Sequence, residues 1–344
     1  MKPPATNRGA ADRVPVLVLT GFLGSGKTTL LNALLRGPAL KDAAVIVNEF
    51  GEIGIDHLLV ETAFEDAVLL KSGCICCTVR GDLVDTLDTL WSRRTRGEIP
   101  PFSRVIVETT GLAEPGPILR TLMTDESIAT HYRLDGIIST VDAVNGSGQL
   151  DHQPESVQQA AMADRLVLTK TDIADAEAVA SLTARLRELN PGAPLLKAVQ
   201  GEVDADQLFD IGLYDARRRE ANIERWLNES AYEEDEHHHD VNRHGDIRAF
   251  CVTRDRPLPW PKLRHWLEAF TSLRGADLLR LKGVVNVVGT AGPVAIHGVQ
   301  HVFHPPTQLK QWPAGDDRRT RLVFIVRNIE REAVEKSLDA ALNG

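Results

Sequence analysis

The chain has 344 residues and a formal net charge of −9 at pH 7. Its length suits two domains, the acidic balance argues against a nucleic-acid partner, and no apolar run approaches the roughly 18–20 residues that cross a bilayer. The start, Met1–Arg13, is polar and has no apolar core segment, so we expect a tail instead of a signal peptide, and a cytoplasmic protein without a membrane partner.

Strand-like runs alternate with helical patterns through the first two thirds of the chain. Short aliphatic and β-branched runs predict strands at 14–20, 43–48, 68–71, 104–108, 136–141, 165–169 and 195–199. Apolar residues at helical spacing predict helices at 29–36, 82–94, 114–123, 154–161 and 175–189. This alternation indicates an α/β fold with a doubly wound, mostly parallel sheet, in which ligands bind at the carboxyl ends of the strands.

The composition changes beyond this region. We expect four parts: a tail at 1–13, a nucleotide-binding domain at 14–215, a charged linker at 216–246 and a smaller α+β domain at 247–344. In the last part the patterns predict strands at 247–253, 284–289, 294–297, 298–304 and 322–326, and helices at 260–273 and 329–342.

The segment Gly21–Thr28 (GFLGSGKT) matches the phosphate-binding loop, G-x-x-x-x-G-K-[ST], at every fixed position and lies between a predicted strand and a predicted helix. Backbone N–H groups of such a loop cradle phosphate oxygens. Lys27 would place its charge on the β- and γ-phosphates, and the Thr28 hydroxyl would bind Mg²⁺. The residues expected to contact the nucleotide here are Gly21, Gly24, Ser25, Gly26, Lys27, Thr28 and Thr29.

A second segment, Glu108–Gly111 (ETTG), follows the predicted strand at 104–108. An acidic residue at this position holds Mg²⁺ or its water shell in P-loop proteins, so Glu108 is a candidate catalytic residue. Gly111 would let a backbone N–H approach the γ-phosphate.

A third segment, Thr169–Asp172, has the pattern T-K-x-D, close to the guanine-reading N-K-x-D. Asp172 would accept hydrogen bonds from the guanine base, and the stem of Lys170 would pack over it. Adenine would leave the carboxylate unpaired, which favours GTP over ATP. Thr169 replaces the usual Asn, which braces neighbouring loops, so we expect looser binding without a change of base.

Three of the four cysteines crowd into Cys74-Ile75-Cys76-Cys77, while Cys251 is isolated and expected in the core. Adjacent cysteines are poor disulfide partners, so the cluster indicates thiolate chemistry in a reduced compartment. From the spacing alone a metal site, a redox centre and a structural turn all remain open. Two or three thiolates would suit Zn²⁺ or Co²⁺ and leave a ligand position open for transfer.

The linker contains a second group of metal-ligating side chains, His237, His238 and His239, among acidic residues. Two readings stand side by side: a solvated acidic loop, and a loop that transiently binds Zn²⁺, Ni²⁺ or Co²⁺ when the imidazoles are neutral.

Taken together, these segments resemble the CobW-type metallochaperones, which belong to the SIMIBI class of P-loop GTPases with the nickel-insertion proteins of hydrogenase and urease. The resemblance rests on Gly21–Thr28, Asn48–Asp56, Gly73–Cys77 and Glu108–Gly111, and on Leu278–Gly283, Gly298–Gln300 and Arg319–Val323 in the C-terminal domain. Thr169–Asp172 with Glu114–Pro117 is closest to the YjiA-like branch, where Thr also replaces Asn.

The resemblance implies a GTPase that carries a metal ion. Asn48–Asp56 would be the first switch segment, and Glu49 its member nearest Mg²⁺ or the hydrolytic water. The cysteines would hold Zn²⁺, with Co²⁺ or Ni²⁺ as competitors, for delivery to a client metalloprotein. A nucleotide-dependent homodimer is a further expected partner.

Three alternatives are carried forward. The first is a cobalt chaperone for cobalamin synthesis or metalloenzyme activation. The second is a metal-storage or sensor protein in which the nucleotide is only structural. The third, a small-molecule kinase, is disfavoured by Asp172 and by the lack of an acceptor site in the sequence.

Overall fold

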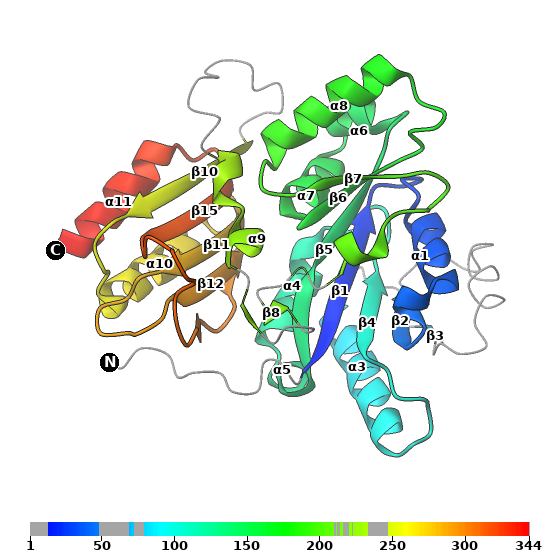
Figure 1. Ribbon diagram of the computed structural model, residues 1–344, viewed down its shortest axis with the longest axis horizontal. Coiled ribbons are helices and arrows are strands. Elements are labelled where there is room, and N and C mark those ends of the chain that lie inside the picture. The colour runs from blue at the N-terminus through cyan, green and yellow to red at the C-terminus, as the bar shows by residue number, and fades with distance from the viewer. Residues whose placement is uncertain are drawn as a thin grey trace. The chain divides into compact units, whose positions relative to one another are not determined.

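The computed structural model describes residues 13–47, 69–71, 79–209, 211, 214–215, 220–221, 223–232 and 247–343. They form two compact units, shown in Figure 1. The first comprises Asp12–Arg187 and Ala193–Gly212, and the second comprises Glu188–Gly192 and the described part of Leu213–Gly344. No helix in the described ranges combines the length and the apolar character needed to cross a membrane.

The first unit is built on a parallel sheet with strand order β3-β2-β4-β1-β5-β6-β7. The strands are β1 (Val14–Gly21), β2 (Ala43–Val47), β3 (Leu69–Lys71), β4 (Arg104–Glu108), β5 (Tyr132–Asp142), β6 (Arg165–Thr169) and β7 (Leu195–Ala198). This order confirms the predicted doubly wound sheet. It also brings the carboxyl ends of all these strands to one edge.

Helices flank this sheet, as Figure 1 shows. They are α1 (Lys27–Arg36), α3 (Val79–Thr95), α4 (Pro115–Thr124), α5 (Glu126–His131), α6 (Gly146–His152), α7 (Pro154–Met162) and α8 (Ala176–Leu189), with 3₁₀ turns η1 (Pro38–Leu40) and η2 (Ala205–Gln207). Leu17 and Leu19 of β1 pack in one core with Leu30 of α1. Val16 and Val18, which alternate with them, are fully buried too. Burial of both sets is expected for a parallel sheet covered on both faces.

One strand begins earlier than the sequence predicts. β5 starts at Tyr132 and not at Gly136, because the charged residues that argued against a strand neutralise each other. Arg133 and Asp135 are both buried, and the Nη1 of Arg133 lies 2.9 Å from the Oδ1 of Asp135.

The second unit contains an antiparallel sheet of order β10-β15-β11-β12-β13, in which β14 also pairs with β12. The strands are β10 (Ile247–Arg254), β11 (Leu278–Val285), β12 (Val294–Val299), β13 (Val302–Phe303), β14 (Thr307–Gln308) and β15 (Thr320–Arg327). Helices α10 (Trp260–Arg274) and α11 (Arg331–Asn343) contribute to a core with Phe324. A second core joins the sheet to α9 (Ile223–Leu227) and η3 (Glu229–Tyr232), with Trp226 and the buried Cys251. A short ribbon, β8 (Tyr214–Asp215) and β9 (Glu220–Ala221), precedes α9.

Two strand predictions in this unit were wrong. The predicted strand at 284–289 ends at Val285; beyond it Val287 forms an isolated bridge with Leu258, and the chain turns at Gly289, which has a φ of 83°. The predicted strand at 298–304 is a hairpin, because Gln300 has a φ of 50° and separates β12 from β13. In both places the β-branched residues favoured a strand, and a residue in the left-handed conformation turns the chain within the predicted range.

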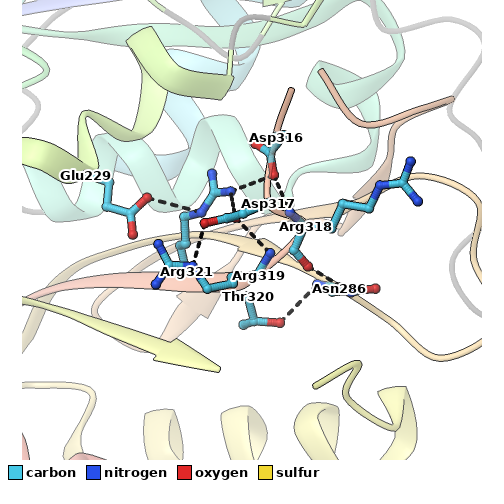
Figure 2. A network of polar contacts seen from close by, with 8 residues as sticks. All are labelled: Glu229, Asn286, Asp316, Asp317, Arg318, Arg319, Thr320 and Arg321. Carbon is cyan, nitrogen blue, oxygen red and sulfur yellow. Dashed lines mark hydrogen bonds and ion pairs between the residues drawn. The ribbon is translucent and has the colours of Figure 1, made fainter. Parts of the chain in front are cut away.

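A network of polar side chains lies at the start of β15, as Figure 2 shows. Arg321 contacts Asp316 at 2.6 Å, Asp317 at 2.7 Å and Glu229 of η3 at 3.1 Å. The carboxylates of Asp316 and Asp317 also accept hydrogen bonds from the backbone N–H groups of Arg318 and Arg319. Burial by itself would raise the pKa of Asp317, but the hydrogen bonds from the backbone N–H of Arg319 and from the side chains of Arg321 and Arg319 together hold it at about 2.

Candidate functional site

The phosphate-binding loop connects β1 to α1 and depends on glycine at three positions. Gly21, Gly24 and Gly26 have φ angles of 140°, 70° and 90°, which residues other than glycine rarely adopt. At Gly21 a Cβ atom would also lie 2.3 Å from the Oγ1 of Thr140. The chain therefore turns tightly from the strand into the helix, so that the N-terminus of α1 faces this edge of the sheet. Such a turn offers backbone N–H groups to an anion.

Lys27 opens α1 and folds back over the loop that precedes it. Its Nζ donates to the carbonyl oxygens of Gly21 at 2.9 Å and Phe22 at 3.2 Å. The side chain is only 9% exposed. The ammonium group is thus held at the loop, where a bound phosphate would meet it.

Thr28 and Glu108 were predicted separately, and the structure brings them together. The Oγ1 of Thr28 donates to the Oε1 of Glu108 at 2.7 Å. Glu108 ends β4, which pairs with β1, and its side chain is 4% exposed. A hydroxyl and a carboxylate are hard oxygen ligands of the kind Mg²⁺ prefers, so this pair fits the predicted magnesium ion.

The loop after β4 lies directly against the phosphate-binding loop. A Cβ atom on Gly111 would be 2.6 Å from the backbone nitrogen of Leu23, so only glycine allows this approach. The hydroxyl of Thr110 is buried and has no hydrogen-bond partner among the described residues. The two loops of the predicted nucleotide site therefore meet, as the role expected of Gly111 requires.

The T-K-x-D segment braces the same loop through its first two residues. The Oγ1 of Thr169 donates to the carbonyl oxygen of Ser25 at 2.8 Å and approaches that of Val141 at 3.2 Å. The Nζ of Lys170 donates to the carbonyl oxygen of Gly24 at 2.8 Å. Thr169 was predicted as a departure that loosens the site, and its hydroxyl is nevertheless a direct brace. Asp172 lies two residues beyond Lys170 and is exposed to solvent, as a base-reading carboxylate must be.

Asp142, at the end of β5, is a member of this site that the sequence analysis missed. Its Oδ2 accepts a hydrogen bond from the Nζ of Lys170 at 2.6 Å and one from the Nδ2 of Asn145 at 3.0 Å. Burial alone would raise the pKa of the Asp142 carboxyl, but the bonds from Lys170, Asn145 and two backbone N–H groups outweigh burial and lower it. The signal that could have found it is the same as for Glu108: an acidic residue directly after a buried strand.

Several predicted site residues lie outside the described residues. They are Glu49 and the rest of Asn48–Asp56, the cysteines Cys74, Cys76 and Cys77, and the histidines His237, His238 and His239. The strands that lead into two of these segments are described. Lys71 of β3 pairs with Val47 of β2, Val47 pairs with Glu108, and Glu108 pairs with Leu19 of β1. The chain thus enters both the 48–68 and the 72–78 segments from the sheet edge that holds the phosphate-binding loop.

Comparison with protein families gives two matches that together span most of the chain. The model described as "CobW/HypB/UreG, nucleotide-binding domain" matches residues 15–197. The model described as "Cobalamin synthesis protein cobW C-terminal domain" matches residues 247–342.

Individual relatives agree with these matches. The chain is 33% identical over 325 residues to "Zinc chaperone YjiA" of Escherichia coli (strain K12), covering 93% of this chain and 96% of that protein. It is 30% identical over 370 residues to "Zinc chaperone CobW" of Sinorhizobium sp, covering 97% and 99%. Among solved structures, the "Zn(II)-bound YjiA GTPase from E. coli" superposes with a TM-score of 0.71 at 27% identity and covers 96% of this chain.

Proposed function

Since the chain belongs to the CobW/HypB/UreG family and carries the CobW C-terminal domain, we propose that it is a GTP-hydrolysing metal chaperone. In this proposal it binds a transition metal, Zn²⁺ by preference, at Cys74, Cys76 and Cys77. It delivers the ion to a client metalloprotein when the nucleotide state changes.

One observation carries the proposal: the row of paired residues across four strands. Lys71, Val47, Glu108 and Leu19 lie side by side, so the segment with the cysteines leaves the sheet in line with the carboxylate beside Thr28. Between them lies Val47, the last described residue before Asn48–Asp56, the expected switch. In this proposal a change at the γ-phosphate is passed along this edge of the sheet to the segments that follow Val47 and Lys71.

The described residues support hydrolysis of a nucleoside triphosphate. Lys27 would stabilise charge on the β- and γ-phosphates, and the loop N–H groups would orient them. Thr28 and Glu108 would hold Mg²⁺, which supplies charge neutralisation of the phosphates when bound. Lys170 and Asp172 would select guanine, and Asp142 would hold the ammonium group of Lys170 in place.

The choice of Zn²⁺ rests on ligand chemistry and on the relatives. Thiolates favour a borderline-soft ion, and the E. coli and Sinorhizobium relatives are named zinc chaperones. Co²⁺ for a corrin pathway is the competing cargo. The E. coli and Sinorhizobium relatives, which match over nearly their full length, make this the better reading than a kinase.

The test is a titration of purified protein with Zn²⁺ and Co²⁺ in the presence of Mg-GDP or a non-hydrolysable Mg-GTP analogue. We expect metal affinity to differ by at least about tenfold between the two states, because a nucleotide can drive release only through a difference in affinity. Cys77→Ala should abolish the difference, and Cys251→Ala, which removes a thiol from the second unit, should preserve it. Equal affinities in both states would contradict the chaperone and support the storage or sensor alternative.

A further inference from the structure

Gln159 of α7 is a buried side chain that reaches the loop carrying Gly111. Its Nε2 donates to the carbonyl oxygen of Gly111 at 3.1 Å and to that of Ala113 at 3.0 Å. The side chain is 1% exposed. Both contacts join segments more than 40 residues apart, so they link α7 to the loop between β4 and α4.

The orientation of this amide is fixed by its partners. Both are carbonyl oxygens, which only accept hydrogen bonds, so the amide nitrogen must face them. The Oε1 of Gln159 then points elsewhere, and it is buried with no hydrogen-bond partner among the described residues. An unmet acceptor in the interior is unfavourable, and a methionine of similar size would avoid it. Packing therefore gives no reason for a glutamine here, whereas its contact with the loop does.

The two hydrogen bonds determine how the loop presents its N–H groups. Because a peptide unit is planar, fixing the carbonyl of Gly111 also fixes the N–H of Leu112 on the opposite side. The N–H of Ala113 closes a turn by donating to the carbonyl of Thr110 at 3.1 Å. On its other side Gly111 lies against Leu23 of the phosphate-binding loop. The turn is thus held between Gln159 and the phosphate-binding loop.

We propose that Gln159 is a positioning residue for the γ-phosphate of GTP. It holds the Gly111–Ala113 turn by its carbonyl oxygens, so that the N–H groups of Gly111 and Leu112 are presented to that phosphate. The inference rests on the proposed function, because this loop meets a γ-phosphate only if a nucleoside triphosphate is bound. GDP has no γ-phosphate and depends on the phosphate-binding loop, which Gln159 does not contact through these bonds.

The test compares Gln159→Met with Gln158→Met in the full chain. Gln158 is on the same helix, is 8% exposed and also has a buried Oε1 without a partner among the described residues, so it controls for loss of a buried amide. We measure dissociation constants for GDP and for guanylyl imidodiphosphate, together with kcat for GTP. Gln159→Met should weaken the triphosphate analogue by about 5- to 20-fold, the range expected for two lost hydrogen bonds, and leave GDP within about twofold. Its kcat should fall, and Gln158→Met should change none of these.

Gln159→Glu provides a second variant of the same shape. Its carboxylate would repel both carbonyls, so it should weaken the triphosphate analogue more than Gln159→Met does and still spare GDP. Equal weakening of both nucleotides, or no change for either variant, would overturn the inference. If the unaltered protein bound neither nucleotide, the proposed function would fail and this inference with it.

Discussion

Polar side chains hold the loops of the two units in different ways. In the nucleotide-binding unit, Lys170, Thr169 and Gln159 all donate to backbone carbonyl oxygens of the loops. In the second unit, Asp316 and Asp317 accept hydrogen bonds from the backbone N–H groups of their own loop, and Arg321 binds the two carboxylates (Figure 2). One carbonyl oxygen of this loop, that of Arg318, also accepts a hydrogen bond from Asn286.

The difference decides what each loop can bind. A loop whose carbonyls are held by side chains can leave part of its N–H groups for an external anion, and these are the groups that bind phosphate. A loop fixed through its N–H groups has used them on carboxylates of its own chain. The first arrangement prepares a ligand site, and the second stabilises a fold.

The largest loss of nucleotide affinity is expected when Lys27 is replaced. Lys27→Ala removes the cation beside the phosphates and the two hydrogen bonds to Gly21 and Phe22. Affinity for both GTP and GDP should fall by about 100-fold or more, measured by fluorescence titration, because charge-assisted bonds to phosphate are lost. Lys41→Ala, at an exposed lysine of the same unit, should leave affinity unchanged. Retention of near-normal affinity in Lys27→Ala would show that the loop is not a phosphate site.

The next largest effect is expected in the second unit, at the loop whose carboxylates are bound by Arg321. Arg321→Met removes the cation shared by the carboxylates of Glu229, Asp316 and Asp317. The arginine side chain is only 9% exposed, so water replaces it poorly. We expect unfolding of the second unit to become easier by about 2–3 kcal/mol, at the low end for a buried pair because Asp317 is 45% exposed. Denaturation followed by tryptophan fluorescence reports on this unit, since Trp226, Trp260, Trp266 and Trp312 lie in it and Trp91 in the other.

A matched control is available two residues earlier, just before β15 begins. Arg319 pairs with Asp317 at the surface, so Arg319→Met should cost no more than about 0.5–1 kcal/mol. Neither variant should alter GTP affinity if the Arg321 cluster serves only the fold. A loss of GTP affinity in Arg321→Met, with the first unit still folded, would refute that separation.

The parts of the site that follow local rules could be predicted from the sequence. Gly21–Thr28 and Glu108 each sit at the end of an aliphatic run, so the strand and its carboxyl end are both readable. The start of β5 could not be predicted, because Arg133 and Asp135 become acceptable in a buried strand only through each other. Helix α6 begins with Gly146-Ser147-Gly148, whose low helix propensity is overridden by the packing of Gly146 beneath Leu182.

The side chains that hold the loops of the site could not be predicted from the sequence, for a different reason. Gln159 meets Gly111, and Thr169 meets Ser25, only after the sheet has formed, so no short spacing encodes either contact. Asp142 could be predicted in part. Its position after a strand can be read from the sequence, but its hydrogen bond with Lys170 cannot. Sequence patterns thus identify the groups proposed to contact the nucleotide, and the fold identifies the side chains that hold their loops in place.

The smallest loss of nucleotide affinity is expected at Thr169. Its hydroxyl oxygen lies 2.8 Å from the carbonyl oxygen of Ser25, so Thr169→Ala should loosen the phosphate-binding loop without changing the Gly111–Ala113 turn. Affinity for GTP and for GDP should fall together, by about 5- to 10-fold, in contrast to the selective loss expected for Gln159→Met. Thr169→Ser keeps the hydroxyl and should stay within about twofold. The ratio of GTP to ITP affinity should not change in either variant, because the 2-amino group that distinguishes the two bases would contact Asp172. A change in that ratio would mean that Thr169 acts on the base and not on the loop, and the brace seen here would not be its main role.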